Sequence, residues 1–246
     1  MEKINSLSLG NGSGNGDRPP FDKGDIQMTT NPLSLLSNHA ADLGIVLPQD
    51  ALPKFDIYLR ELKIWNEKFN LTAIKDDQGI AIKHFLDSLT PLKFIKPGSA
   101  MLDIGSGAGF PGIPLKIVEP SLKITLIDSV NKKVTFMKHI ISELGLTDIE
   151  AVHSRAEELA KTKKGNYDVV ISRALTNLSD FIKLGEPLLK ADGVLIAMKG
   201  SKADEEVKEA VKIMGKRKMQ VRAIERLSLP MGAGERGLVI IEKKIQ

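Results

Sequence analysis

The stretch Met101-Leu-Asp-Ile-Gly-Ser-Gly-Ala-Gly-Phe-Pro-Gly112 decides the fold of this chain. An apolar run leads into closely spaced glycines and prolines follow, which predicts a strand, a tight turn and the start of a helix. Gly105, Gly107 and Gly109 lack a Cβ atom, so the backbone can turn sharply and a ligand can approach it closely. Such a turn is typical of a nucleotide-type ligand site in an α/β domain.

Two carboxylates accompany this turn. Asp103 precedes the glycines, and Asp128 ends the next apolar run, Lys123-Ile-Thr-Leu-Ile-Asp128. At the carboxyl end of a strand, Asp128 can accept hydrogen bonds from both hydroxyls of a ribose, which selects a ribose without a 2′-phosphate.

The spacing of the glycines decides between cofactors. A dinucleotide fingerprint requires glycine where Phe110 stands, and a P-loop requires lysine where Ile113 stands. Glycines in the order G-x-G-x-G after Asp103 are instead typical of S-adenosylmethionine (SAM) methyltransferases. The alternative is a glycine turn that serves packing alone, and the two strand-end carboxylates speak against it. We therefore expect SAM to be held by a set that includes Asp103, Gly105, Gly107, Gly109 and Asp128.

The composition excludes several classes of protein. The chain has 246 residues, enough for one α/β domain with an appendage, and it has no cysteine. It therefore has neither a disulfide framework nor a cysteine-rich metal site, nor the cysteine nucleophile that methylation at carbon 5 of a pyrimidine generally needs. The histidines show no metal-ligand spacing, so no metal is expected. No apolar run is long enough to span a bilayer and no signal peptide is evident, so we expect a cytoplasmic protein without a membrane partner.

The basic residues are unevenly distributed. The net charge is only +4, but the excess lies entirely after residue 198. This segment could contact a phosphate backbone, although a solvated helix face explains the same pattern because acidic residues alternate with several of the lysines. The basic residues in question are Lys199, Lys202, Lys212, Lys216, Arg217, Lys218, Arg222, Arg226 and Arg236.

The chain divides into three parts. Residues 1–30 are rich in glycine and polar residues and are expected to be a disordered extension. Residues 31–97 have helical periodicity and are expected to form an N-terminal helical cap, with apolar residues such as Phe55, Leu59 and Leu62 on one stripe.

Residues 98–246 are expected to form the SAM-binding domain. Apolar runs at 100–105, 123–128, 148–153, 167–172 and 193–199 alternate with helical stretches, and two further runs follow at 221–227 and 237–243. The fold class is thus α/β: a Rossmann-like class I methyltransferase with a doubly wound, mostly parallel sheet and a C-terminal antiparallel hairpin.

Two further segments follow predicted strands. After the third comes Ser154-Arg-Ala-Glu-Glu158, where the N–H of Ala156 and the carboxylate of Glu157 could contact adenine, although Ser154 and Glu157 also have the spacing of a capping box. After the fourth comes Ser172-Arg-Ala174, where enzymes that methylate exocyclic amines carry an Asn/Asp-Pro-Pro-aromatic motif that this chain lacks. A ring nitrogen such as guanine N7 loses no proton and suits a site with an arginine there; Arg173 as a surface cation is the alternative. His84 stands alone in a helix, and a structural role is as open as a functional one.

These segments resemble the RsmG (GidB) family, bacterial methyltransferases of guanine N7 in 16S ribosomal RNA. The resemblance runs over residues 32–244 and is carried by the glycine stretch with its Gly-Phe-Pro-Gly-Ile-Pro continuation, by Lys83-His-Phe-Leu-Asp-Ser-Leu and by the Ser-Arg-Ala tripeptide. It implies that Gly105, Phe110, Ala156, Glu157 and Arg173 hold SAM. It also implies that Asn70, Arg155 and Arg236 lie near the reacting groups, in contact with cofactor or RNA. Lys199-Gly and Gly234-Glu-Arg are among the motifs that carry the resemblance. The chain departs from the family at Gly237, where family members often carry histidine, beside the RNA contact expected at Arg236.

The resemblance therefore implies an rRNA methyltransferase whose partner is 16S rRNA or the small ribosomal subunit, and we expect it to act as a monomer. We expect guanine N7 to attack the SAM methyl in line, without a general base, with catalysis resting on alignment by Arg173, Arg236 and Asn70. RNA contacts are expected at Arg155, Lys199 and Arg236. Two other classes stay open: a SAM methyltransferase that acts on a protein or small molecule, and a non-enzymatic RNA-binding assembly factor. An NAD-dependent enzyme is disfavoured because Phe110 interrupts the fingerprint.

Overall fold

The structure, a computed structural model, describes residues 31–173 and 177–244. The expectation for residues 1–30 and the contribution of Ala174 to the Ser-Arg-Ala tripeptide lie outside these residues. Among the described residues, no helix is long and apolar enough to cross a membrane.

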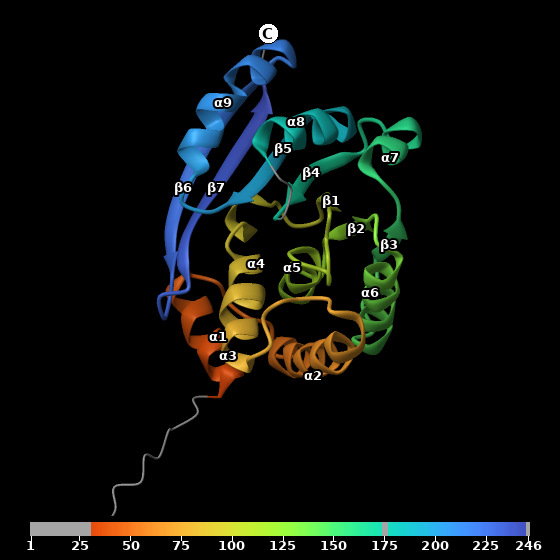
Figure 1. The fold of residues 1–246 in the computed structure, drawn as a ribbon, viewed down its shortest axis with the longest axis vertical. Coiled ribbons are helices and arrows are strands. Elements are labelled where there is room, and N and C mark those ends of the chain that lie inside the picture. The colour runs from red at the N-terminus through yellow and green to blue at the C-terminus, as the bar shows by residue number, and fades with distance from the viewer. Residues whose placement is uncertain (1–30, 174–176, 245–246) are drawn as a thin grey trace, which may run out of the picture.

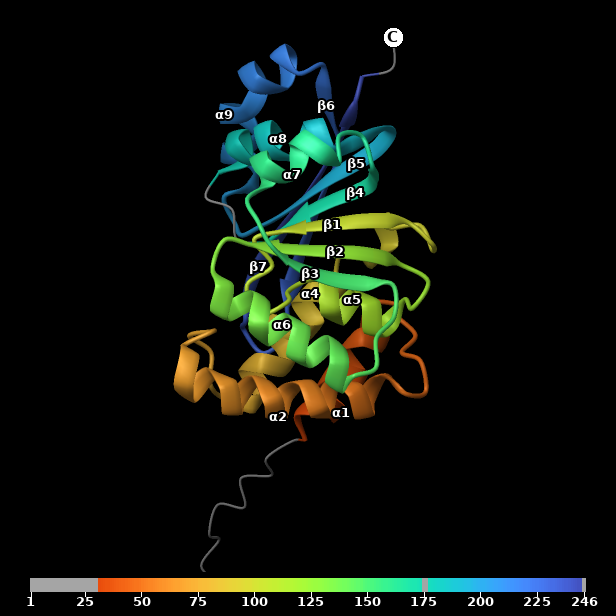
Figure 2. The same ribbon diagram turned by 90° about the vertical axis from the view of Figure 1, so that its right-hand side faces the viewer.

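A seven-stranded sheet organises the chain, in the order β3-β2-β1-β4-β5-β7-β6 (Figures 1 and 2). β1 to β5 pair in parallel, whereas β7 is antiparallel to both of its neighbours. This confirms the predicted doubly wound sheet with its antiparallel C-terminal strands. The strands are β1 (Ala100–Ile104), β2 (Lys123–Asp128), β3 (Ile149–His153), β4 (Tyr167–Ser172), β5 (Leu189–Lys199), β6 (Met219–Leu229) and β7 (Gly234–Lys243).

The last three strands are longer than their apolar runs. β5 begins at Leu189, before the expected residue 193, and β6 and β7 extend the hairpin to ten or eleven residues each. Polar residues at the ends of these strands interrupt the apolar pattern, while the backbone ladder continues because β7 pairs along its length with β6.

Helices cover both faces of the sheet. Successive residues of a strand point to opposite faces, so Met101 packs with one layer and Leu102 with the other. Figure 2 shows α1, α2, α5 and α6 on one side and α7, α8 and α9 on the other. The helices are α1 (Pro32–Asp42), α2 (Ala51–Phe69), α3 (Asp77–Gly79), π-helix η1 (Ile80–Leu86), α4 (Asp87–Leu89), α5 (Gly112–Val118), α6 (Asn131–Glu143), α7 (Ala156–Thr162), α8 (Leu178–Gly185) and α9 (Ala203–Lys216), with short 3₁₀ turns at Leu92–Phe94 and Glu186–Leu188.

The N-terminal helices share one core with the sheet. Phe55 and Leu62 of α2 are fully buried in the same cluster as Met101 and Ile240 of the strands. At about 25 cal/mol per Å² of buried apolar surface, this contact contributes strongly to the stability of the fold. The expected stripe of α2 is therefore the surface that fixes the cap to the sheet.

One local expectation differs from the structure. The capping box expected from Ser154 and Glu157 does not form, because α7 begins one residue later, with Arg155 at the N-cap and no side-chain cap bond. The hydroxyl of Ser154 donates to the carbonyl of Arg155 instead.

Candidate active site

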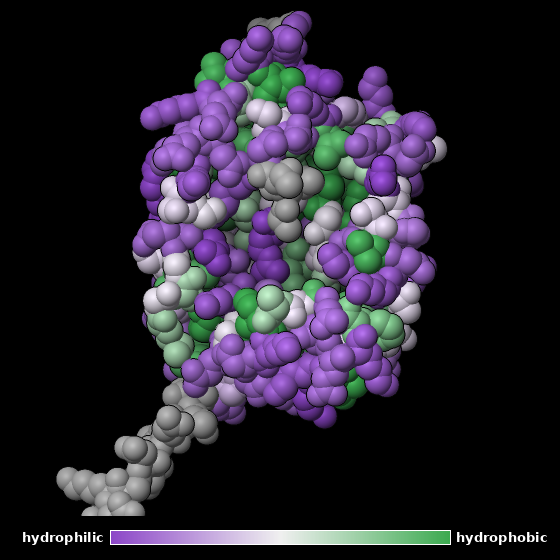
Figure 3. Space-filling model, viewed as in Figure 1, coloured by the Kyte–Doolittle hydropathy of each residue, from purple (hydrophilic) through white to green (hydrophobic). Residues whose placement is uncertain are grey.

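The charged residues that the sequence analysis singled out lie at the carboxyl ends of the parallel strands. Asp128 ends β2, Arg173 follows β4 directly and Lys199 ends β5. β7 runs in the opposite direction and pairs Gly237 with Lys199, so Arg236 reaches the same edge. In doubly wound sheets ligands bind outside this edge, where the strand order reverses, which here is between β1 and β4. The space-filling view of the face drawn in Figure 1 is hollowed near its centre, with hydrophilic side chains around the hollow (Figure 3).

The glycine turn leaves open space beside its backbone. Gly105 and Gly107 have φ values of +72° and +62°, which L side chains rarely adopt. A Cβ atom at either position would meet no atom within 4 Å. The N–H of Gly107 donates to Oδ2 of Asp128 at 2.9 Å, which ties the turn to β2. A flat ligand can therefore approach this backbone closely.

Asp128 lies in a cavity of about 480 Å³, which we call the Asp128 cavity. Gly105, Ala156 and Glu157 line it too, so the structure brings together residues from three strand ends that the sequence assigned to SAM. Arg155, which was assigned to RNA contact, lines the same cavity. Oδ1 of Asp128 accepts from the N–H of Val130 at 2.9 Å. Each carboxylate oxygen still has a second lone pair, which can accept from a ribose hydroxyl.

Asp103 is completely buried in β1. Its Oδ2 accepts from the N–H of Gly112 at 2.9 Å, but its Oδ1 has no hydrogen-bond partner among the described residues. Burial raises the pKa of Asp103 to about 7, although Gly112 and the nearby Arg173 oppose the shift. A buried acceptor without a partner is costly. Together with the open glycine turn and Asp128, it fits SAM, which carries a ribose and an ammonium group.

The side chain of Phe110 packs against the helical cap. Its ring is buried and stacks on His84, at 4.5 Å between centroids and 12° between planes, and on Tyr58 at 5.3 Å and 18°. The hydroxyl of Tyr58 donates to the carbonyl of Ala108, inside the glycine turn. Phe110 does not line the Asp128 cavity. Its side chain fastens the glycine turn to the helical cap.

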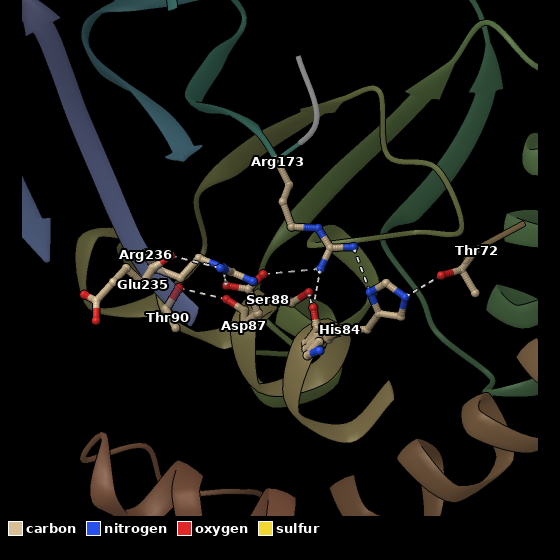
Figure 4. Close-up of polar contacts among 9 residues, drawn as sticks. Thr72, His84, Asp87, Ser88, Thr90, Arg173, Glu235 and Arg236 are labelled. Atoms are coloured by element: carbon tan, nitrogen blue, oxygen red, sulfur yellow. Dashed lines mark hydrogen bonds and ion pairs between the residues drawn. The ribbon is translucent and has the colours of Figure 1, made fainter. Parts of the chain in front are cut away.

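His84 links the cap to Arg173. Its Nδ1 lies 3.2 Å from Nη2 of Arg173, and its Nε2 lies 2.7 Å from Oγ1 of Thr72 (Figure 4). Burial lowers the pKa of His84 to about 3, and the neighbouring charge of Arg173 adds to the shift. His84 is thus neutral near pH 7, and the structure gives this lone histidine a positioning role toward Arg173.

Asp87 holds both arginines of the site. Its Oδ1 accepts from Nε of Arg236 at 2.9 Å, and its Oδ2 lies 3.7 Å from Nη1 of Arg173 (Figure 4). The side chain of Asp87 is 3% exposed. Arg173 also donates to the carbonyl of Lys83 at 3.2 Å. One buried carboxylate of the cap therefore fixes guanidinium groups that come from the ends of β4 and β7.

These residues border a second cavity, which we call the Asp87 cavity, with a volume of about 320 Å³. Arg173, Lys199, Arg236 and Lys83 line it beside a single carboxylate, that of Asp87. Cations in excess of carboxylates, with guanidinium N–H groups at the wall, suit a ligand that is anionic or rich in acceptors. The carbonyl and phosphate oxygens of a nucleotide meet this description.

The remaining predicted residues lie in different surroundings. Lys199 has a side chain that is 8% exposed and forms an ion pair with Glu206 at 2.8 Å. Arg155 is exposed at the rim of the Asp128 cavity. Asn70 ends α2 with a φ of 48° and lines a third, smaller cavity, not the two described above.

Sequence reasoning missed Asp87 and Tyr58. Asp87 stands in the quoted segment Lys83-His-Phe-Leu-Asp-Ser-Leu, where its spacing from His84 places both side chains on one helix face. That signal could have marked Asp87. For Tyr58 the sequence carried no signal, because its partner in the glycine turn is remote in the chain.

Comparison with known proteins places this geometry in a family. Residues 51–238 match the family model described as GidB, rRNA small subunit methyltransferase G. The protein of Geotalea uraniireducens (strain Rf4) named ribosomal RNA small subunit methyltransferase G is 45% identical over 209 residues, which are 85% of this chain and 95% of the relative. The protein of the same name from Staphylococcus haemolyticus is 42% identical and covers 88% of this chain and 91% of its own.

Solved structures share the fold at lower identity. A SAM-dependent methyltransferase from Aquifex aeolicus has a TM-score of 0.54 at 20% identity and covers 70% of this chain and 96% of its own. This likeness supports the class I methyltransferase architecture. With the family model matching most of its length, this chain belongs to the GidB family of rRNA small subunit methyltransferases.

Proposed function

We propose that this protein transfers a methyl group from SAM to N7 of a guanine in a loop of bacterial 16S rRNA. The observation that carries the proposal is the placement of two cavities at one sheet edge. The Asp128 cavity suits a nucleoside, and the cation-lined Asp87 cavity suits a nucleotide of RNA. Membership of the GidB family supports rRNA as the substrate.

SAM is held by the residues at the ends of β1, β2 and β3. Asp128 accepts from the ribose hydroxyls, and the N–H of Ala156 with the carboxylate of Glu157 contacts the adenine. Gly105 and Gly107 let the backbone lie against the ligand, whereas Gly109, which was also expected to contact SAM, instead leaves room for the side chains of Tyr58 and Ile113. Asp103 supplies the acceptor that has no partner among the described residues. When bound, SAM would supply a sulfonium methyl group whose carbon a nitrogen lone pair can attack in line, with the bond to sulfur breaking and S-adenosylhomocysteine leaving as a neutral thioether.

The Asp87 cavity receives the target guanine. Arg173 and Arg236 cannot act as bases, because a guanidinium remains protonated in proteins. His84 is no base either, since both of its ring nitrogens have partners. This suits N7 of guanine, which carries a free lone pair and loses no proton. The arginines donate to the carbonyl or phosphate oxygens and hold the base in line, where alignment at roughly 3 to 3.5 Å supplies most of the rate enhancement.

RNA is expected to lie over the helical cap and the C-terminal hairpin. We assign RNA contact to Arg236, to Arg155 at the rim of the Asp128 cavity, and to Asn70, which lines a smaller cavity at the end of α2. The buried pair of Lys199 with Glu206 makes Lys199 a wall of the site and not a surface contact. We further propose that residues 31–97 serve RNA binding and residues 98–246 serve SAM binding, and that the protein acts as a monomer in the cytoplasm.

The experiment that tests the proposal measures transfer of labelled methyl from SAM to unmodified small subunits, free 16S rRNA, transfer RNA and DNA. We expect label in small-subunit RNA alone, recovered as 7-methylguanosine. The Asp128→Ala variant serves as the control that removes the ribose contact. Label in protein, or in no macromolecule although SAM binds, would contradict the RNA assignment.

A further inference from the structure

A third cavity lies beside the Asp87 cavity and has no part in the site described so far. It has a volume of about 170 Å³ and lies between the end of α2 and the loop that follows, and we call it the Thr72 cavity. Ile74 lines both the Thr72 cavity and the Asp87 cavity, so the two are neighbours. Ile74 thus separates two cavities that could receive neighbouring parts of one ligand.

The hydroxyl proton of Thr72 is available to a ligand in this cavity. Arg173 can only donate, so Nδ1 of His84, at 3.2 Å from its Nη2, must accept. Neutral His84 then carries its proton on Nε2 and donates it to Oγ1 of Thr72 at 2.7 Å. The N–H of Ile74 donates to the same oxygen at 3.1 Å. Both lone pairs of the hydroxyl are occupied, and its proton is left to donate.

A second donor lies next to it. The N–H of Thr72 donates to Asn66 at 2.8 Å, so the accepting atom of this amide is oxygen and the other atom is nitrogen. The side chain of Asn66 is largely buried and lines the cavity. Among the residues that the structure describes, its amide nitrogen donates to no protein atom. Thr72 and Asn66 therefore offer fixed donors within one small cavity.

The charges around the cavity favour a neutral ligand. Lys63 forms an ion pair with Asp77, and the lining also includes one acidic residue, Glu67, and one further basic residue, Lys75. A phosphate would meet the carboxylate, whereas the edge of a base offers acceptors for the two donors and a donor for Glu67. The cavity holds the volume of roughly five or six water molecules, which suits one base and not a longer segment.

We propose that the Thr72 cavity binds the Watson–Crick edge of an unpaired base that neighbours the methylated guanine, with Thr72 and Asn66 as its donors. Unpaired loop bases are read on this edge by RNA-binding proteins. The inference rests on the proposed function, because the neighbour exists only if the Asp87 cavity holds a guanine of RNA. Arg173 then contacts the guanine directly. Through its hydrogen bond to His84, it also orients the Thr72 hydroxyl that donates to the neighbouring base.

The Asn66→Asp variant tests this proposal. It keeps the oxygen that accepts from Thr72 and replaces the amide donor by an oxygen. The matched control is Asn166→Asp, which makes the same charge change at an exposed position on the opposite edge of the sheet. Filter binding measures the affinity for unmodified 16S rRNA, with intact loops or with single nucleotides around the target guanine made abasic in turn.

For Asn66→Asp we expect an affinity for intact RNA about tenfold below that of the wild type, as one lost hydrogen bond predicts. SAM affinity should stay unchanged, and Asn166→Asp should bind like the wild type. At one position, removing the base should lower the RNA affinity of the wild type but should not lower the RNA affinity of Asn66→Asp any further. Equal losses in both variants, or a penalty for Asn66→Asp that persists with every abasic RNA, would overturn the proposal.

Thr72→Val and Thr72→Ser provide a second pair of variants, of which only the serine retains the hydroxyl. We expect Thr72→Ser to bind intact RNA more tightly than the abasic RNA, as the wild type does, and Thr72→Val to bind both equally. If both variants still prefer intact RNA, Thr72 does not have the proposed role. Failure of the proposed function would look different, since the wild type itself would then bind SAM but show no preference for 16S rRNA.

Discussion

Replacing Asp87 by asparagine should destabilise the fold, because it leaves two guanidinium groups without their buried counter-charge. The side chain of Asp87 is 3% exposed, whereas those of Arg173 and Arg236 are 19% and 22% exposed. Removing one partner of a fully buried pair costs about 3–5 kcal/mol, and an exposed pair contributes at most about 1 kcal/mol. The arginines keep some contact with water and asparagine still offers an acceptor. We therefore expect the free energy of unfolding to fall by about 2 to 3 kcal/mol.

Urea and thermal unfolding of Asp87→Asn measure this loss. For a chain of this size each kcal/mol shifts Tm by roughly 2–4 °C, so Tm should fall by about 4–12 °C. A double-mutant cycle with Arg236→Gln isolates the pair, and we expect a coupling of about 1–3 kcal/mol. The control is Glu158→Gln, which removes the exposed pair with Lys161 and should cost under about 1 kcal/mol.

The reasoning is refuted if Asp87→Asn is as stable as Glu158→Gln, or if the losses from Asp87→Asn and Arg236→Gln simply add. In either case the buried carboxylate would not be what holds Arg236. An unchanged free energy of unfolding with lost methyl transfer would instead place Asp87 in contact with the substrate.

Three further predictions concern the two cavities. Asp128→Ala should weaken SAM binding about 100-fold or more, because two hydrogen bonds to a charged acceptor are lost; calorimetry measures this, and an unchanged Kd would remove Asp128 from the ribose site. Arg236→Gln, which removes the charge without setting a second carboxylate beside Asp87, should raise the RNA concentration needed for half-maximal methyl transfer while SAM affinity stays intact; equal losses of both would contradict an RNA contact by Arg236. His84 has its pKa lowered to about 3 in the fold, so the unfolded chain binds the additional proton and stability rises with pH from about 3 to about 6.5. We therefore expect the free energy of unfolding, measured in urea, to fall more from pH 7 to pH 5 for the wild type than for His84→Gln. Equal decreases would contradict a buried neutral His84.

The strands and the glycine turn could be predicted because their signals are local. Parallel strands buried on both faces have near-continuous apolar sequences, such as Ile124 to Ile127 of β2. The turn after β1 requires positive φ at Gly105 and Gly107, and glycine satisfies it within the segment itself. The placement of Asp128 then follows from the strand order, since the ends of β1 and β2 are adjacent.

The cluster around Asp87 could not be predicted in this way. Asp87 and Arg236 are 149 residues apart in sequence. Their contact depends on β7 pairing with β5 and on the helical cap packing against the sheet. Phe110 illustrates the reverse case. Its position in the glycine stretch pointed to the cofactor, whereas packing of the cap turns its ring toward Tyr58 and His84.

The burial of Lys199 could not be predicted either. Charge counted along the sequence carries no information on burial, and its pairing with Glu206 depends on how α9 packs beside β5. A lysine that ends a central strand can be drawn into the site wall if a carboxylate from a neighbouring helix compensates its burial.

The most direct test of the central claim uses unmodified 16S rRNA in which 7-deazaguanosine replaces the target guanosine. This base keeps the shape and the Watson–Crick edge of guanine and lacks only the N7 lone pair. We predict that the RNA binds as tightly as the natural RNA and accepts no methyl group from labelled SAM. Methyl transfer to the substituted nucleotide would contradict the assignment of N7 as the atom that this protein methylates.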